Sequence, residues 1–257
     1  MFDKYLVTLD TDWVSDPIIS EVSNYLISNR IKCTWFITHS SPAIRRLFDN
    51  PDLFEIGIHP NFREDSTQGD NPREILRHLL EIAPESKSLR THSLVQSTPL
   101  LIMMRHEFNI LHDVSLYLPE TPNIIPHEVQ LFDKSLWRCP YFWEDSFELL
   151  KPQKDFSFSD VKYHVQGVKI FSFHPIHVFL NSNTLDTYER LKSEKDVRRC
   201  SISDCKPYIN HAGKGAGTFF RELVQRIVDS EFPGLTVSDL ASEWRSRSPG
   251  GCKEAKN

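Results

Sequence analysis

The sequence predicts an α/β fold, and within that class a single-domain, irregular barrel of the (β/α)7 type. Short apolar runs rich in β-branched and aromatic residues alternate with helix-like stretches, the pattern of buried parallel strands joined by helices. At the end of several successive runs, or just after it, stands an ionisable residue. The chain of 257 residues is long enough for one large core. Because the strand ends of a barrel meet at one rim, we expect these ionisable side chains to form a site there.

The predicted helices begin where a polar residue stands directly before proline. Such a pair supplies an N-cap and then fills the first helical position, where the fixed φ of proline fits. The pairs mark helices over residues 16–30, 43–50, 71–82 and 98–107, between strands that end near residues 9, 38, 58 and 91. Strands and helices therefore alternate through the first half of the chain, as in a parallel sheet.

The second half of the chain predicts the remaining strands and two closing helices. Strands are expected within residues 110–118, 131–144 and 168–173, and helices over 218–231 and 238–245. These elements complete one barrel domain over residues 1–245.

Two segments fall outside this pattern. Residues 181–217 are polar and charged without an apolar period, and are predicted to form a long loop or loosely helical insertion over the rim. Long rim segments of this kind serve as lids, and we expect the same here. Residues 246–257 are small and charged, and are predicted to be a disordered tail.

Composition and charge exclude several classes of protein. A net charge of -5 with 25% charged residues leaves no basic footprint for a nucleic acid. No apolar stretch approaches the roughly 18 residues of a membrane span, and the start lacks a signal-peptide pattern. The five cysteines are scattered and odd in number, which argues against a disulfide framework. We expect a cytoplasmic protein with no transmembrane segment and no nucleic-acid partner.

Candidate site residues stand at or just after the ends of the apolar runs. In chain order they are Asp10 with Asp12, His39, His59, His92, Arg138 and His174. Residues two apart in a strand face the same side, so Asp10 and Asp12 are both expected to enter the barrel mouth. Any one residue alone is compatible with a structural role, such as a helix cap for His39 or a buried, hydrogen-bonded imidazole for His92. Their recurrence in order favours an active site.

Four short segments resemble the motifs of the polysaccharide deacetylase (NodB-homology, carbohydrate esterase) superfamily. They are TLDTDW at residues 8–13, EIGIH at 55–59, WRCPY at 137–141 and SFHP at 172–175. More narrowly, they resemble the WbmS-like branch, which is associated with bacterial surface-polysaccharide gene clusters. The resemblance implies a metal-dependent deacetylase on an irregular barrel.

The resemblance also implies a role for each matching residue. Asp12 and His59 would bind the metal. Asp10 would act as general base on the attacking water, and His174 would protonate the leaving nitrogen. Arg138 would either hold Asp10 in place or bind an anionic part of the substrate. The residues expected to contact the sugar lie next to these motifs: Trp13, Asn61, Tyr141 and Trp143.

One metal ligand of the family pattern is missing. Arg63 stands where the family has a second histidine, and a cation there would repel a metal. Either the metal is absent or the third ligand comes from elsewhere, with His92 as first candidate, His39 as second and Asn61 as third. One carboxylate and two imidazoles favour zinc as the cofactor, although cobalt, iron or nickel bind the same donors.

The predicted function is removal of an acyl group, expected to be acetyl, from an N-acylated amino sugar in bacterial surface-polysaccharide biosynthesis. The substrate would be a small sugar or a lipid- or nucleotide-linked one. Two alternatives stay open: hydrolysis of another small amide, and a carbohydrate-binding protein that keeps the barrel without catalysis. A tightly bound divalent metal distinguishes the enzymes from the binding protein.

Overall fold

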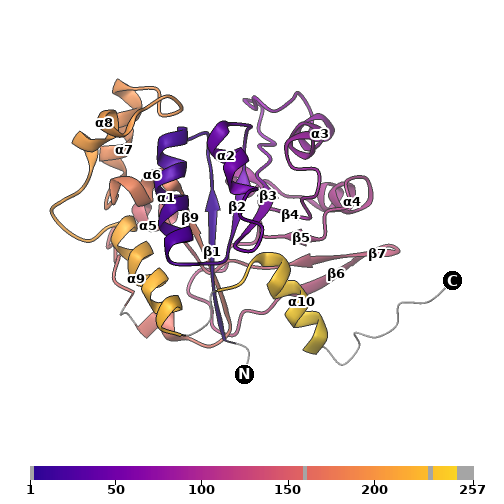
Figure 1. Ribbon diagram of the computed structural model, residues 1–257. Coiled ribbons are helices and arrows are strands. Elements are labelled where there is room, and N and C mark those ends of the chain that lie inside the picture. The colour runs from indigo at the N-terminus through magenta and orange to yellow at the C-terminus, as the bar shows by residue number, and fades with distance from the viewer. Residues whose placement is uncertain (1–2, 159–160, 231–233, 248–257) are drawn as a thin grey trace.

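The computed structural model describes residues 3–158, 161–230 and 234–247, in which helices pack around one sheet (Figure 1). The strands are β1 (Lys4–Asp10), β2 (Cys33–Ile37), β3 (Phe54–Ile58), β4 (Ser88–Leu89), β5 (His112–Asp113), β6 (His127–Leu131), β7 (Lys134–Arg138), β8 (Trp143–Glu144) and β9 (Val168–Phe173). The α-helices are α1 (Asp16–Ser28), α2 (Pro42–Leu47), α3 (Pro72–Ile82), α4 (Thr98–His106), α5 (Asp145–Leu150), α6 (Pro175–Leu180), α7 (Leu185–Glu194), α8 (Ile202–Cys205), α9 (Ala216–Asp229) and α10 (Val237–Arg247). Short 3-10 turns are η1 (His92–Leu94), η2 (Val161–His164) and η3 (Lys206–Tyr208).

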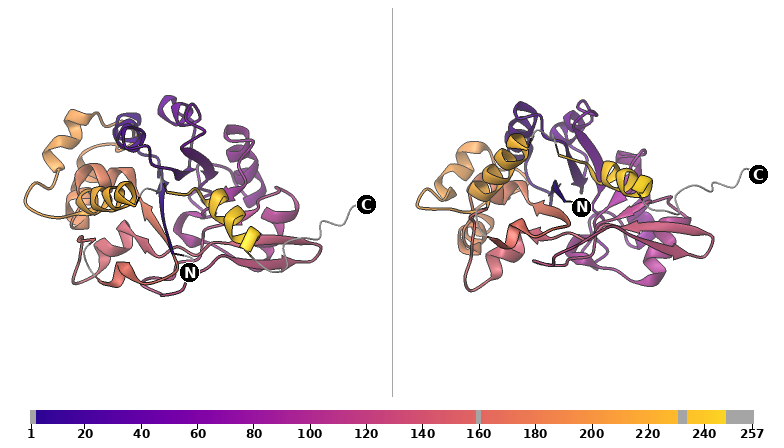
Figure 2. Two further views of the ribbon diagram at one scale, coloured as in Figure 1. Left: turned by 60° about the horizontal axis from the view of Figure 1, so that its bottom comes forward. Right: turned by 90° about the horizontal axis from the view of Figure 1, so that it is seen from below.

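The sheet is curled and almost entirely parallel (Figure 2). Its strand order is β6-β7-β5-β4-β3-β2-β1-β9-β8, and β6 with β7 is the one antiparallel pair among the described strands. An isolated parallel bridge joins Tyr117, which follows β5, to Tyr141, which precedes β8, and so links the two sides of the curl. The predicted fold class, a single-domain irregular α/β barrel, is confirmed.

The central strands are buried on both faces, which explains why their sequences are continuous apolar runs. Every residue of β2 and of β9 is buried. The parallel register pairs Leu9 of β1 with Phe173 of β9. The residues that follow them, Asp10 and His174, therefore reach the same rim at the carboxyl ends of the strands.

The helices start at the predicted polar–proline pairs, with the N-cap at the pair or one residue before it. Ser41 Oγ accepts a hydrogen bond from the backbone N–H of Ile44 at the start of α2. Asn71 Oδ1 accepts hydrogen bonds from the N–H groups of Arg73 and Glu74 at the start of α3. Because each cap satisfies an N–H that the helix leaves free, the local sequence is enough to set these boundaries.

The structure differs from the sequence prediction between residues 110 and 144. β5 has only two residues, and β6 and β7 form a hairpin where the sequence predicts one strand-bearing segment. β6 is an edge strand with mostly exposed residues, so it lacks the apolar run that marks the buried strands. Phe132, which is 76% exposed with a φ of 57°, lies in the turn of this hairpin.

Residues 181–217 contain α7 and α8 and lie beside the rim (Figure 1). Only Leu191 is buried in α7, so the helix has little apolar periodicity, and its sequence resembles that of a loop. None of the helices in the described part of the chain combines the length and apolar character that a membrane span requires.

α10 covers the opposite end of the barrel, at the amino ends of the strands (Figure 1). Its residues Val237, Leu240 and Ala241 are buried. The helix includes residues 246 and 247, which the sequence assigns to the disordered tail, so that boundary is wrong. The rest of the predicted tail, residues 248–257, lies outside the described residues.

Candidate metal and active site

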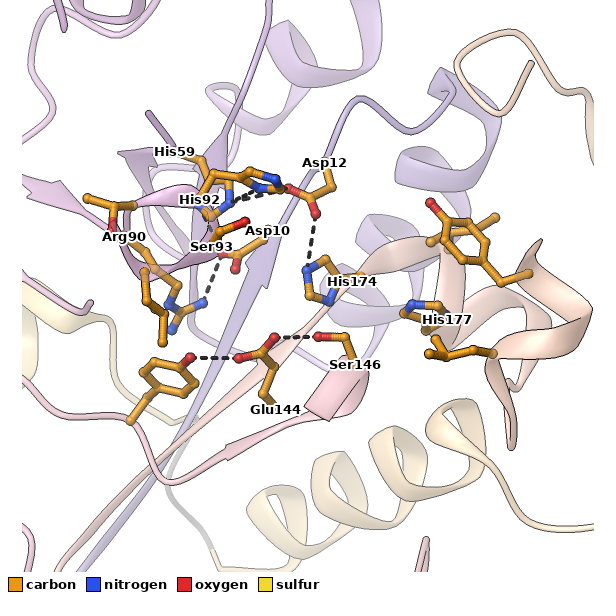
Figure 3. Close-up of a pocket in the computed structure, with 16 residues that line it drawn as sticks. Asp10, Asp12, His59, Arg90, His92, Ser93, Glu144, Ser146, His174 and His177 are labelled. Carbon is orange, nitrogen blue, oxygen red and sulfur yellow. Dashed lines mark hydrogen bonds and ion pairs between the residues drawn. The ribbon is translucent and has the colours of Figure 1, made fainter. Parts of the chain in front are cut away.

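Asp12, His59 and His92 meet at the rim with their ligand atoms facing one another (Figure 3). His59 Nε2 lies 3.2 Å, and His92 Nδ1 3.3 Å, from Asp12 Oδ1. The two imidazole nitrogens are 3.3 Å apart. We call these three side chains the Asp–His–His group; they are supplied by the segments that follow β1, β3 and β4.

The spacing and chemistry of the Asp–His–His group fit a divalent metal. Ligand atoms about 2.0–2.1 Å from a tetrahedral zinc lie about 3.3–3.4 Å from one another. Asp12 Oδ1, which faces both imidazoles, is buried without a well-oriented hydrogen-bond donor among the described residues. One carboxylate and two imidazoles are donors that suit zinc, cobalt, iron and nickel. The group thus offers three ligands of a tetrahedral site.

Left-handed backbone turns carry two of these ligands. Asp12 and Trp13 have φ values of 38° and 56°, and Ser93 and Leu94 in the turn after β4 have 53° and 54°. Such conformations cost roughly 1–3 kcal/mol each and cluster at functional sites. β1 ends at Asp10, so a turn after the strand brings Asp12 to the rim. The sequence predicts that Asp10 and Asp12 enter the barrel mouth together because side chains alternate along one strand, and that reason is wrong.

The pKa shifts within the Asp–His–His group show mutual stabilisation of charge. Burial raises the pKa of Asp12, but contacts with His174, His59 and His92 outweigh it and hold the pKa well below its usual value. Burial lowers the pKa of His92, and its contact with the Asp12 carboxylate outweighs this and raises it. A metal would replace a proton on the imidazole, so metal binding is expected to weaken at low pH.

Asp10 is held by the buried Arg90. Arg90 Nη1 donates hydrogen bonds to Asp10 Oδ1 at 2.9 Å and to Ser172 Oγ at 2.8 Å. The guanidinium also lies over the rings of Phe36 and Tyr141, 4.7 and 4.8 Å from their centroids. Because a buried charge needs its partner, Arg90 holds the Asp10 carboxylate in one position at the rim.

His174 is oriented from behind by Asp145 and faces Asp12 in front. Its Nδ1 lies 2.6 Å from Asp145 Oδ1, and its backbone N–H donates to Asp145 Oδ2 at 2.7 Å. Its Nε2 lies 3.3 Å from Asp12 Oδ2. Burial lowers the pKa of His174, but the charges of Asp145 and Asp12 outweigh it and raise the pKa well above its ordinary value. These contacts favour the protonated form of the imidazole, with Nε2 facing Asp12.

One cavity joins these groups (Figure 3). Besides Asp10, Arg90, His174 and the Asp–His–His group, its lining includes residues that the sequence analysis does not select: Thr91, Ser93, Leu94, Glu144, Ser146, Ile176, His177, Leu185 and Tyr188. Leu185 and Tyr188 belong to α7, so residues 181–217 contribute to the cavity wall. Burial lowers the pKa of His177 to about 4, which makes it a neutral imidazole at the cavity.

Arg138 does not contact Asp10. Its Nε donates to Asp113 Oδ2 at 2.8 Å, and Asp113 is completely buried. The predicted contact with Asp10 is wrong, because the strand order places β7 between β5 and β6, away from β1. Arg138 is also not among the residues that line the cavity. Arg90 makes the contact with Asp10 that was predicted for Arg138. The sequence feature that points to Arg90 is its position two residues before the candidate ligand His92.

The two other candidates for the third ligand lie apart from the Asp–His–His group. His39 Nδ1 is 2.9 Å from Thr38 Oγ1, and burial lowers the pKa of its imidazole. Asn61 is buried, and its backbone N–H donates to Gln68 Oε1 at 2.7 Å. Asn61 does not line the cavity, so its predicted contact with the sugar also lacks support. Of the three candidates, the structure brings His92 to the other ligands.

Arg63, the departure from the family motif, is directed toward solvent. Its side chain is 56% exposed and its Nε lies 3.6 Å from Asp65 Oδ1. Arg63 therefore gives no reason to exclude a metal from the Asp–His–His group.

Of the aromatic residues predicted to contact the sugar, Tyr141 lines the cavity. Trp143 is 1% exposed and stacks on Phe219 of α9, with ring centroids 4.3 Å apart. Its predicted sugar contact is wrong, because side chains alternate along a strand and Trp143 points to the helices. Trp13 packs edge-on against His92 at 5.4 Å and lines a neighbouring depression beside α7.

The fold and the site together define a class of protein. It is an α/β barrel that carries an Asp–His–His group, an arginine-held carboxylate and a carboxylate-held histidine at the carboxyl ends of its strands.

Comparison with known proteins gives the family. The model of the WbmS-like polysaccharide deacetylases matches residues 7–192. The structure of WbmS from Bordetella bronchiseptica, described as a polysaccharide deacetylase involved in O-antigen biosynthesis, is 32% identical with a TM-score of 0.75, over 86% of this chain and 90% of that chain. This chain belongs to the WbmS-like polysaccharide deacetylase family.

More distant matches concern the fold alone. A 4-alpha-glucanotransferase from Thermococcus litoralis is 10% identical with a TM-score of 0.50, over 94% of this chain and 38% of that chain. No curated protein matches this chain.

Proposed function

We propose that this chain is a metal-dependent N-deacetylase that removes an acetyl group from an acylated amino sugar in bacterial surface-polysaccharide biosynthesis. The observation that carries the proposal is one cavity lined by the Asp–His–His group, a carboxylate fixed by an arginine and a histidine oriented by a carboxylate. The family supports deacetylation, and the O-antigen role described for the Bordetella protein supports the surface-polysaccharide setting.

Asp12, His59 and His92 would hold the metal. A divalent cation, when bound, supplies a Lewis acid that polarises the amide carbonyl and eases deprotonation of a water. Zinc suits these donors best, and cobalt, iron or nickel would fit them too. These three protein ligands would leave a coordination position free for water or substrate.

Asp10 and His174 would move the protons. Asp10 takes a proton from the attacking water; its Oδ1 lies 3.8 Å from Nδ1 of His59, so it borders the Asp–His–His group. His174 donates a proton from Nε2 to the leaving nitrogen, because Asp145 occupies its Nδ1. A general base and a general acid each contribute about 10²–10⁴-fold to the rate.

The proposal extends to the domain and the substrate. Residues 1–245 would act as one catalytic domain with residues 181–217 as a lid, since Leu185 and Tyr188 line the cavity. The substrate would be a small sugar or a lipid- or nucleotide-linked one, and a cytoplasmic location stays a prediction.

Metal content and acetate release test the proposal. After incubation with zinc, cobalt or nickel, the wild type should carry about one divalent ion per chain. It should release acetate from a member of a panel of N-acetylglucosamine, N-acetylgalactosamine and their nucleotide-linked forms. His92→Ala should lose metal and activity, whereas His39→Ala, the matched control, should keep both. A wild type without metal would contradict the proposal and favour the carbohydrate-binding protein.

A further inference from the structure

Glu144 is a carboxylate on the cavity wall that the proposed reaction does not use. Its Oε2 accepts a hydrogen bond from the Tyr141 hydroxyl at 2.6 Å, and its Oε1 accepts one from the Ser146 hydroxyl. Both donors are neutral, and a carboxylate has about four acceptor positions, so about two stay open. Within the described part of the chain, no lysine, arginine or histidine forms an ion pair with Glu144.

The sheet register directs this side chain into the cavity. Glu144 pairs in register with Ser172 of β9. The Ser172 hydroxyl contacts Asp10 and Arg90 inside the barrel, and in-register neighbours in a sheet point to the same side. Figure 3 shows the Glu144 carboxylate on the same side of the cavity as His174.

The charges in the cavity leave Glu144 without a positive partner. Asp10 is paired with Arg90, and Asp12 faces the imidazoles and, in the loaded protein, the metal. Amide hydrolysis breaks the C–N bond, places the oxygen of water on the acetate and leaves both of its protons on the nitrogen. At neutral pH the products are therefore acetate and an ammonium group. The ammonium forms beside His174, near a divalent cation that repels it.

We propose that Glu144 binds this ammonium group and so recognises the deacetylated amino sugar by its charge. The identity of the ligand rests on the proposed function, whereas the open carboxylate is a feature of the cavity itself. Two hydroxyl donors hold the carboxylate in place before the ligand arrives, which reduces the cost of ordering it on binding.

Binding of free amino sugars tests Glu144 separately from turnover. The probes are glucosamine and galactosamine, with glucose and galactose as neutral counterparts in which a hydroxyl replaces the ammonium group. NMR titration of the metal-loaded wild type should show about 10-fold tighter binding of the amino sugars, as for other charge-assisted hydrogen bonds. Glu144→Gln keeps the size of the side chain and should remove most of that preference. Glu128→Gln, at an exposed position of β6, is the matched control and should retain it.

Each outcome decides the inference. An equal preference in the wild type and in Glu144→Gln overturns it, and so does a wild type with no saturable binding of either amino sugar. If acetate is released and metal is bound but no Glu144-dependent preference exists, the proposed function stands and this inference fails. If amino sugars bind through Glu144 without any acetate release, the inference stands and the deacetylase proposal fails.

Discussion

Each end of the barrel carries a cluster of carboxylate, histidine and hydroxyl groups, and the two clusters differ in how their polar atoms are satisfied. At the amino ends of the strands, Glu55 accepts hydrogen bonds from the hydroxyls of Thr34 and Ser88 at 2.9 and 2.5 Å. It also accepts hydrogen bonds from the backbone N–H and the hydroxyl of Ser238 at 2.9 and 2.6 Å. Both Glu55 oxygens are therefore used within the protein, and they anchor the start of α10.

At the rim, residues of the same types have buried polar atoms without hydrogen-bond partners among the described residues. Asp12 Oδ1 and His59 Nδ1 are buried without hydrogen-bond partners in the described part of the chain, and the backbone at Asp12 is left-handed. Buried unsatisfied groups of this kind are rare and costly in folded proteins. The two clusters share residue types and burial. They differ in whether their buried polar atoms are hydrogen-bonded, and this difference distinguishes the candidate active site from the structural cluster.

The histidines of the two clusters differ in the same way. Burial lowers the pKa of His112, which lies beside Glu55, to about 4, so its imidazole is neutral. At the rim, carboxylates raise the pKa of His174 well above its ordinary value. His112 is 5% exposed and its Nδ1 lies 2.9 Å from Ser88 Oγ.

The largest effect is expected from the rim carboxylates. Asp12→Asn removes a charged ligand and should lose metal and acetate release together. Asp10→Asn leaves the Asp–His–His group intact, so it should bind metal like the wild type while turnover falls by about 10²–10⁴-fold. Elemental analysis and acetate assays on the same samples check both results. Equal metal loss in the two variants would contradict their separate roles.

A similar loss of turnover is expected when His174 loses its support. Asp145→Asn removes the carboxylate that orients the imidazole, and kcat should fall by about 10²–10⁴-fold with little change in KM. Asp113→Asn, at another fully buried carboxylate, is the control and should keep kcat. Steady-state kinetics on both variants makes the measurement, and equal kcat values would remove the positioning role of Asp145.

A smaller effect is expected from exchanging the two arginines for lysine. The Arg90 guanidinium bonds Asp10 and Ser172 through Nη1 and Thr8 Oγ1 through Nη2. Lysine has a single nitrogen and cannot reproduce this planar arrangement, so Arg90→Lys should lower kcat by about 10–100-fold. Arg138→Lys should stay within about threefold of the wild type, because Arg138 is bonded to Asp113 instead. If Arg138→Lys lowered kcat more than Arg90→Lys, Arg138 and not Arg90 would be the arginine that supports the active site.

Substitution at the amino ends of the strands should change stability and spare activity. Ser238→Ala removes the hydroxyl contacts with Glu55 and His112 and should lower the free energy of unfolding by about 1–2 kcal/mol. Urea unfolding measures the change, and kcat of the folded protein should be unaltered. A loss of kcat without a loss of stability would mean that the two clusters are coupled.

The smallest effect concerns His112 and pH. Unfolded chains protonate histidine near pH 6.5, whereas folded His112 resists protonation to about pH 4, so stability falls as pH decreases between these values. The slope contributed by this one residue is at most about 1.4 kcal/mol per pH unit. Unfolding curves of the wild type and His112→Gln across this range isolate it. Parallel slopes would show that His112 binds its proton equally in both states.

The sequence by itself determined which segments become buried strands and which side chains follow them to the rim. Apolar runs and polar–proline pairs act over a few residues, so strand positions and helix starts could be predicted locally. Since parallel strands share one direction, residues that follow them, such as Asp10, His59 and His174, arrive at one end. The edge strand β6 and helix α7 escaped prediction because few of their residues are buried.

Tertiary structure decided which of these residues are partners. Arg90 and Asp10 are 80 residues apart, and β2 and β3 lie between their strands, so they meet because the sheet curls and Arg90 reaches across its interior. Arg138 stands at a strand end too, but its strand lies farther along the sheet. The turn that presents Asp12 and the register that presents Glu144 likewise depend on neighbouring segments. Local sequence preferences determine where each strand forms, whereas the curling of the sheet determines which interior side chains face one another.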